Sequence, residues 1–337
     1  MTTYIIRRLI GAVIMLVIVS IVTFAIFFLV PRLVGATPEN MASRYAGRTA
    51  SAETQKLNAE RLGFYDPLPV QYGRFVKGLV AGSEYNTGTM VEQCPAPCFG
   101  YSYLTRQPVW PDLVDRSRVT LSLAVGAAVI WVIAGVATGV ISALRPRSLF
   151  DRAAMGIALS GVSLPVFFTG MIMLVIFSYS LGWTVPGGTY VDFTVDPFQW
   201  AYSLILPWIS LAFLFAAGYA RLTRAGMLEA MNEDYIRTAR AKGLPERVVV
   251  VRHGLRAALT PIVTIFGLDF GLLLGGAVLT ESTFSLNGLG KYAIDAIGSN
   301  DLPKVMGVTL LAALFVVIAN LIVDLLYAVV DPRVRLS

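Results

Sequence analysis

The side chains that most often carry out catalysis are scarce in this sequence and form no recognisable set. His253 is the only histidine, and the two cysteines, Cys94 and Cys98, are spaced C-x3-C without the further ligands that a zinc site needs. Gly290-Lys291 lacks both the first glycine and the following hydroxyl residue of a nucleotide-binding loop. The sequence therefore predicts no catalytic site, metal site or cofactor in this chain, and any energy from nucleotide hydrolysis must come from a partner.

Asp269 is the acidic residue whose position most strongly suggests a function, because it lies within an apolar run at residues 257–280. An ionised carboxylate at that depth is costly unless it is solvated or paired. On a helix it points about 160° away from Gly267, Gly271 and Gly275, whose spacing is typical of close helix contacts. Two interpretations of Asp269 stay open: it faces a wet pathway and favours cationic groups, or it is a structural pair or a protonated buried acid. The glycines predict close packing, either inside this chain or against a second membrane subunit.

The polar segment Arg221–Pro261 separates two apolar runs and carries eight basic residues. Ala239 and Gly243 stand one helical turn apart between cations, which lets another protein approach closely, and Pro245 predicts a corner directly after Gly243. We therefore predict a short docking helix hinged at this corner, with an ordinary basic cytoplasmic loop as the alternative. The predicted docking residues are Tyr235, Arg237, Thr238, Ala239, Arg240, Ala241, Lys242, Gly243 and Leu244.

The elements that would position these residues are membrane-spanning helices. The chain has 337 residues, of which 56% are hydrophobic and 14% charged. Six apolar stretches are long enough to cross about 30 Å of hydrocarbon. They are Leu9–Val30, Val119–Leu144, a stretch within Ala153–Trp183 that Pro165 is expected to kink, Phe198–Ala220, Ala257–Thr280 and Val305–Val330. The sequence predicts an all-α membrane protein, and its net charge of +6 needs no nucleic acid because retained cytoplasmic cations account for it.

The long polar segment 31–118 is predicted to lie on the extracytoplasmic side of the membrane, with a short helix at Ser51–Leu62 and otherwise loops and turns. The proposed inside segments hold 15 Lys and Arg and the outside segments 12, but ten of the latter lie in residues 31–118. So long a segment translocates largely regardless of charge, so both termini are predicted to be cytoplasmic. Cys94 and Cys98 would then face an oxidising compartment, where we expect a disulfide that shapes the loop locally.

Several stretches resemble permease subunits of ABC importers of the dipeptide and oligopeptide type. Asp234–Gly243 is similar to the EAA loop of that family, with Arg237-Thr238-Ala239 at the Glu-Ala-Ala positions. Gly275–Glu281, followed by Gly288-Leu289-Gly290, is similar to the exit of its fifth helix. Asn320–Tyr327 with Asp331-Pro332-Arg333 resembles its C-terminal signature. Two features depart from the family: Val91–Tyr103 looks like an insertion, and Asn287 stands where proline is usual.

The resemblance implies the type I ABC importer permease fold. The expected parts are residues 1–30 with the first helix, the extracytoplasmic segment 31–118, the core 119–330 with a docking loop at 221–258, and the tail 331–337. Residues 281–304 would form a re-entrant or scoop-like outer segment, with a plain loop as the alternative.

The expected partners are a second homologous permease, two ATPase subunits or domains that bind ATP and magnesium, and an extracytoplasmic substrate-binding protein, all at a bacterial cytoplasmic membrane. The chain would form half of a translocation pathway for peptides. The alternatives are another solute, such as a nickel chelate, an ion-coupled secondary transporter, and a membrane receptor or assembly scaffold that uses the same docking loop without moving solute.

Overall fold

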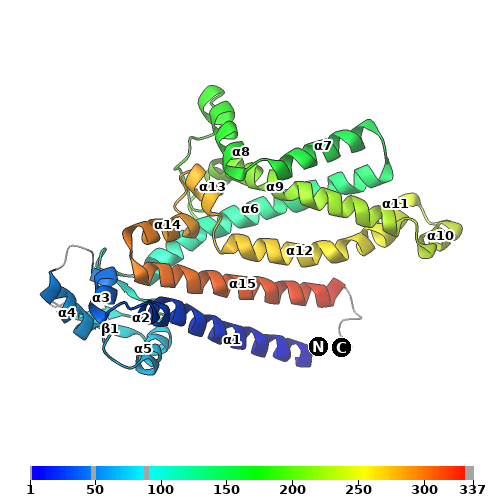
Figure 1. The fold of residues 1–337 in the computed structure, drawn as a ribbon. Coiled ribbons are helices and arrows are strands. Elements are labelled where there is room, and N and C mark those ends of the chain that lie inside the picture. The colour runs from blue at the N-terminus through cyan, green and yellow to red at the C-terminus, as the bar shows by residue number, and fades with distance from the viewer. Residues whose placement is uncertain (1, 47–50, 87–90, 331–337) are drawn as a thin grey trace.

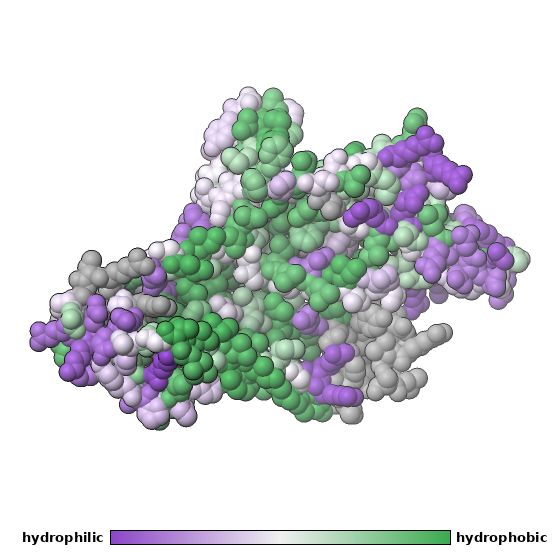
Figure 2. Space-filling model, in the orientation of Figure 1, coloured by the Kyte–Doolittle hydropathy of each residue, from purple (hydrophilic) through white to green (hydrophobic). Residues whose placement is uncertain are grey.

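The computed structural model describes residues 2–46, 51–86 and 91–330. They form a long helical bundle with a small domain at one end (Figure 1). Five stretches of the described residues are long and apolar enough to cross a membrane. They are Ile6–Leu33, which belongs to α1 (Thr2–Phe24), η1 (Ala25–Leu29) and α2 (Val30–Leu33); α6 (Val109–Leu144); α9 (Pro197–Ala230); Glu246–Leu274, which ends with α12 (Arg256–Leu274); and Leu302–Val323 of α15 (Leu302–Val330). The visible surface is apolar over the middle of the bundle and polar at both ends (Figure 2), which confirms the predicted all-α membrane class.

The third predicted span is broken rather than kinked. α7 (Leu149–Ser163) and α8 (Val166–Met173), which η2 (Leu174–Ser180) continues, meet at an angle of 106°. Pro165 has no N–H to donate, and its ring disfavours the helical conformation at Leu164, whose ψ is 132°. α8 therefore leaves the bundle steeply (Figure 1), and the described residues hold five spans, or six if the bent pair counts as one.

The core of the bundle lies between α6 and α9, which approach each other closely along much of their length. A side chain at Gly135 would come within 2.6 Å of Tyr219, and one at Gly139 within 2.5 Å of Thr223. Trp131 is fully buried in this interface, where its ring stacks on Phe215 at 4.8 Å. Close packing of this kind fixes α9, and α9 in turn carries the predicted docking segment.

The segment between α1 and α6 is a small folded domain, not the mostly irregular loop that the sequence predicted. The expected helix at Ser51–Leu62 is confirmed as α4, and the Ser51 hydroxyl caps it by accepting from the Thr54 N–H. An aromatic cluster that includes Phe24, Phe28 and Phe64 joins this domain to the end of α1. Its elements are α3 (Pro38–Ala46), α4 (Ala52–Arg61), α5 (Leu68–Ala81) and two antiparallel hairpins, β1 (Ser83–Asn86) with β2 (Val91–Cys94) and β3 (Tyr101–Ser102) with β4 (Gln107–Pro108).

The connection from α12 to α15 lies at the same end as this domain and is also helical. α12 ends at Leu274, earlier than the predicted Thr280, because Gly275 and Gly276 form a turn in which Gly276 has φ +123°. Two helices follow, α13 (Val278–Thr283) and α14 (Leu289–Ser299). The plain-loop alternative for residues 281–304 is therefore excluded.

The opposite end carries the predicted docking segment, and we call it the α10 end. α9 continues to Ala230, beyond the predicted Ala220, and three elements then lead into α12: α10 (Asp234–Ala241), α11 (Glu246–Val248) and η3 (Val249–Leu255). The first residues of α1 and the last of α15 lie toward this end (Figure 1). The other end, with the small domain and α14, is the α14 end. The predicted tail, residues 331–337, lies outside the described residues.

Candidate functional site

A small apolar cluster holds α10 against the bundle. Ile236 is 0% exposed and Ala239 is 6% exposed, and both pack with Val249 of η3 and with Met231, just after α9. This corrects the prediction for Ala239, which faces its own chain and is not open to a partner. The reason is that a short amphipathic helix must bury its apolar face, and residues three apart share that face.

The other predicted docking residues all lie on the exposed face of α10 or on the corner after it. Tyr235 is 44% exposed, and Arg237 forms an ion pair with Asp234, one turn earlier on the same helix. Partial burial, followed by the charge of Glu233, raises the pKa of Tyr235, so its hydroxyl stays neutral. The exposed residues are Tyr235, Arg237, Thr238, Arg240, Ala241, Lys242, Gly243 and Leu244. Together they form a cationic surface, which we call the α10 face.

The corner after α10 is fixed by backbone conformation and by one ion pair. Gly243 has φ +76°, which ends the helix, and a Cβ there would meet nothing within 4 Å. The Arg240 guanidinium donates two hydrogen bonds to Glu246, of 2.7 Å from Nη2 and 3.2 Å from Nε. This bidentate pair joins α10 to α11 across the corner, so the corner is built as a shaped unit.

A second ion pair ties the α10 end together and was missed from the sequence. Arg224 of α9 donates from Nε and Nη2 to Asp151 of α7 at 2.7 and 2.8 Å, and the Asp151 side chain is only 5% exposed. Asp151 also accepts from the Arg147 N–H at 2.8 Å. Ser148 before Asp151 is a helix-start signal that points to this site, but nothing in the sequence names Arg224 as the partner.

Asp269 lies in α12 and receives one hydrogen bond, from the Tyr219 hydroxyl of α9 to Oδ2 at 3.0 Å. No ion pair in the described part of the chain involves this carboxylate. Asp269 is partly exposed, whereas Tyr219 is only 2% exposed. The carboxylate thus lies at the border between the packed interior and the open side of α12.

The three glycines on the other side of α12 face α15 of the same chain. A Cβ at Gly267 would come within 2.6 Å of Val323, and one at Gly271 would meet Ala319 and Val316 at 3.7 Å. Gly275 lies opposite Ala312. Of the two alternatives left open by the sequence, the structure shows packing inside this chain.

The α14 end holds a buried carboxylate that sequence reasoning did not identify as a site. Glu281 is 0% exposed; its Oε1 accepts from the Thr120 hydroxyl at 2.7 Å and its Oε2 from the Lys291 N–H at 2.9 Å. The Leu289 N–H donates to the Thr120 hydroxyl at 2.8 Å. Burial raises the pKa of the Glu281 carboxyl, and the hydrogen bonds from Lys291, Thr120 and Gly290 act in the opposite direction.

These contacts satisfy the first N–H groups of α14 with side chains from α6 and α13, which locks three helices into one unit. Gly288 packs directly on the Glu281 carboxylate, which a Cβ there would approach to 2.3 Å. The stretch of residues 275–290 that carries the family resemblance is therefore the stretch that builds this lock.

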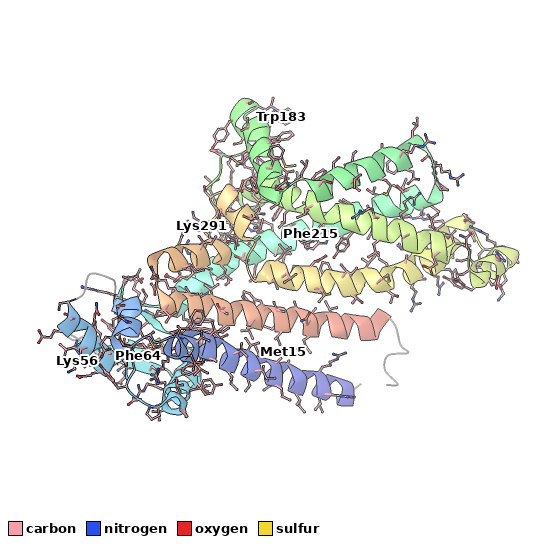
Figure 3. The ribbon with its side chains drawn as sticks, viewed as in Figure 1. Met15, Lys56, Phe64, Trp183, Phe215 and Lys291 are labelled. Carbon is pink, nitrogen blue, oxygen red and sulfur yellow. A yellow bond between two sulfur atoms is a disulfide. The ribbon has the colours of Figure 1, made fainter. Side chains whose placement is uncertain are left out.

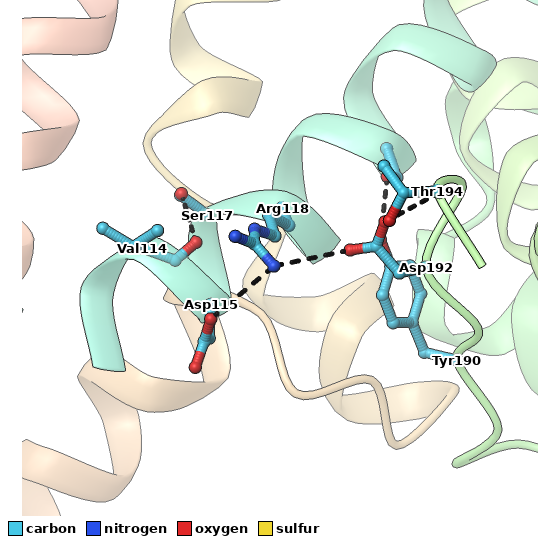
Figure 4. A network of polar contacts seen from close by, with 8 residues as sticks. Val114, Asp115, Ser117, Arg118, Tyr190, Asp192 and Thr194 are labelled. Carbon is cyan, nitrogen blue, oxygen red and sulfur yellow. Dashed lines mark hydrogen bonds and ion pairs between the residues drawn. The ribbon is translucent and has the colours of Figure 1, made fainter. Parts of the chain in front are cut away.

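The loop between α8 and α9 is held to α6 nearby by a network centred on Asp192 (Figure 4). Arg118 lies 3.8 Å from Asp192 and 3.9 Å from Asp115, while Thr194 donates to Asp192 from both its N–H and its hydroxyl. The hydrogen bonds from Thr194 are the main cause that lowers the pKa of Asp192, and the charge of Arg118 contributes less. This loop is therefore positioned by α6 as well.

Cys94 and Cys98 are joined by a disulfide with Cα atoms 5.6 Å apart. They line a cavity of about 570 Å³ between the small domain, η1 and the first residues of α15. Within residues 2–46, 51–86 and 91–330, no three His, Cys, Asp or Glu side chains are grouped to hold a metal ion. His253 lies in η3 and is partly exposed.

Most of the chain matches models of one family of membrane transport proteins. The family model described as "Binding-protein-dependent transport system inner membrane component" matches residues 135–336, and the model of the corresponding N-terminal region matches residues 1–124. This chain belongs to that family. It is therefore a multi-pass component of a binding-protein-dependent transporter of the inner membrane.

Relatives of this inner-membrane component cover nearly its full length. It is 39% identical over 336 residues to a putative peptide transport system permease protein of Brucella abortus (strain 2308), with 99% of each chain covered. It is 37% identical over 335 residues to the glutathione transport system permease protein GsiC of Escherichia coli (strain K12), again with 99% of each covered.

Among solved structures, the fold resembles a chain from the inward-facing MetNI methionine ABC transporter. The TM-score is 0.51 with 20% sequence identity, over 65% of this chain and 96% of that one. The likeness confirms the predicted ABC importer permease fold.

Proposed function

We propose that this chain is the transmembrane permease subunit of an ATP-driven importer for peptides. The relatives named for peptide and glutathione transport share 37–39% identity over the full length, which supports this substrate class over a metal chelate. An ion-coupled mechanism finds little support, because Asp269 is joined to a tyrosine and not to an intramembrane charge.

The observation that carries the mechanism is the α10 face. A cationic helix that is anchored by Ile236 and ends at a rigid corner presents its charges outward, which suits contact with an acidic or polar cleft on another protein. In our proposal an ATPase subunit docks there. When the ATPase subunit closes, it moves α9 and α12, the two long helices on either side of α10 in the chain. The α10 end then faces the cytoplasm, and both termini lie on that side.

The proposed assembly contains this chain, a second homologous permease, two ATPase subunits or domains and an extracytoplasmic substrate-binding protein. In this assembly ATP and magnesium bind to the ATPase subunits. The small domain and α14 then face the binding protein, and the two permeases share the pathway, which opens alternately to each side.

The test is to purify the importer through a tag on this chain and to measure ATP hydrolysis with and without its binding protein loaded with trialanine. The wild type is expected to show stimulated hydrolysis. Gly243→Trp should abolish the stimulation while the chain still inserts, since the new side chain would stand on the α10 face and would strain the φ +76° corner. Unchanged stimulation in this variant, or a tagged chain that brings no ATPase, would contradict the proposal.

A further inference from the structure

We infer that Asp269, Tyr219, Phe266 and Phe270 form an amine-recognition site, which binds the primary ammonium group of the transported solute on its way across the membrane. The inference rests on the proposed function for the identity of the solute, but the site itself is argued from the geometry of α9 and α12.

The side of the Asp269 carboxylate that faces away from α15 and from Tyr219 must lie in a polar environment. Gly267 and Gly271 occupy the face that packs on α15, and Tyr219 of α9 covers one oxygen of the carboxylate. The neighbouring exposed residues on α12 are Leu268 at 58% and Leu272 at 73%. A carboxylate at the edge of such a surface is strongly disfavoured against lipid, so this edge faces a water-filled pathway.

The Asp269 carboxylate keeps acceptor capacity that the described residues do not fill, above all at Oδ1. Oδ2 already accepts from Tyr219, and Tyr219 is the hydrogen-bond partner of Asp269 among the described residues. A guanidinium prefers to bind both carboxylate oxygens at once, whereas an ammonium can bind one. A metal ion would need more ligands than one carboxylate and one phenol, and no such group occurs among the described residues.

Aromatic residues flank Asp269 along α12 and also pack around its partner Tyr219. Phe266 and Phe270 stack at 5.4 Å on the same helix as Asp269, one turn before it and one residue after it. Behind them Trp131 lies 6.1 Å from Phe266 and 6.2 Å from Tyr219, and Phe215, midway along the bundle (Figure 3), stacks on Trp131. Ring faces attract an ammonium and also accept the apolar groups next to it.

Together these groups recognise an organic cation with an apolar body, and a peptide amino terminus has this chemistry. Tyr219 acts as a positioning residue, since its hydrogen bond fixes Oδ2 of the carboxylate. Trp131 is 0% exposed and bounds the site on the side of the packed α6–α9 interface.

The test uses Leu272→Cys, one turn from Asp269, as a reporter in the purified importer. Both native cysteines are in the disulfide, so they do not react. We expect a cationic methanethiosulfonate to modify the reporter about tenfold faster than an anionic one, because a nearby carboxylate attracts the first and repels the second. Asp269→Asn should bring the two rates together, and Tyr219→Phe should give an intermediate ratio. Ile18→Cys on α1, which is 52% exposed on the apolar outer side of the bundle, is the matched control and should stay unreactive.

Protection of the reporter identifies the ligand. Trialaninamide, which carries an ammonium, should slow modification of Leu272→Cys in the Asp269 protein and not in the Asn variant, whereas N-acetyl-trialaninamide should not protect either. A reporter that reacts with neither reagent, a rate ratio that Asp269→Asn leaves unchanged, or equal protection by both compounds would overturn the site. These readouts do not use ATP hydrolysis, so failure of the site can be told apart from failure of the proposed function.

Discussion

The two ends of the bundle place their charges in opposite ways. At the α10 end the side chains of Arg237 and Arg240 are 74% and 45% exposed, and a small apolar cluster supplies the anchorage. At the α14 end Glu281 is 0% exposed and is bonded to Thr120 and to the start of α14. The first end leaves its charge available to another protein, whereas the second uses its charge to hold its own helices. Variants at the two ends should therefore fail differently.

The largest effect is expected from Glu281→Ala. The substitution leaves the Thr120 hydroxyl and the N–H of Lys291 without an acceptor, and each buried unpaired group costs about 1–3 kcal/mol. We expect a clear drop in the melting temperature of the purified chain and loss of folded yield. Glu233→Ala, an exposed glutamate at the other end, is the matched control and should melt like the wild type. Equal melting temperatures for the two variants would show that the α14 end is not locked as described.

Ile236→Ala should have the next largest effect, and a local one. The fully buried side chain anchors α10, and such truncations cost about 2–4 kcal/mol. Because α10 lies at one end of the bundle, we expect only a local effect. Hydrogen exchange in α10 should be faster and ATPase stimulation should be lost, with little change in the global melting temperature. Ile294→Ala, at a half-exposed position of α14, is the control. Unchanged exchange in α10 would contradict the role of the cluster.

Cys94→Ser with Cys98→Ser should have a moderate effect that is confined to the small domain. The ring closed by this disulfide spans a sequence separation of four, so the model of chain entropy gives about 2 kcal/mol. We expect increased exchange in β1 and β2 and unchanged ATPase stimulation. A loss of stimulation equal to that of Ile236→Ala would mean that the two ends are coupled through this loop.

The smallest effect on stability is expected at Arg240 and Glu246, because both side chains are exposed. Arg240→Glu should leave the melting temperature unchanged but lower ATPase stimulation, since it places two like charges across the corner after α10. Adding Glu246→Arg should restore the corner and part of the stimulation. If the double variant is no better than the single one, the charge of Arg240 acts on the partner and not on the corner.

The sequence predicted the spans and the short helix with its corner at Gly243 because both depend on patterns that are local in the chain. Apolar runs are set by the membrane, and a helix end at Gly243 is set by one residue that tolerates φ +76°. The domain at 31–118 was underestimated because its helices pack through contacts with residues outside the segment, such as Phe28 and Met306.

The candidate sites show the same limit. Tyr219 and Asp269 are 50 positions apart, Arg224 and Asp151 are 73 apart, and Thr120 and Glu281 are 161 apart, so only the fold brings these pairs together. The sequence placed Ala239 on the wrong face because a small residue fits both a docking surface and a tight helix contact, and sequence alone does not separate the two. The burial of Ile236, one turn earlier, decides between them.

The central claim, that the α10 face docks an ATPase, is tested most directly by site-specific photocrosslinking in intact cells. A photoreactive amino acid at Thr238 should form an adduct with a protein that carries a nucleotide-binding loop, identified by mass spectrometry, while the same amino acid at Lys291 should not. An ATPase adduct at Lys291, or none at Thr238 in a chain that is inserted and folded, would contradict the account.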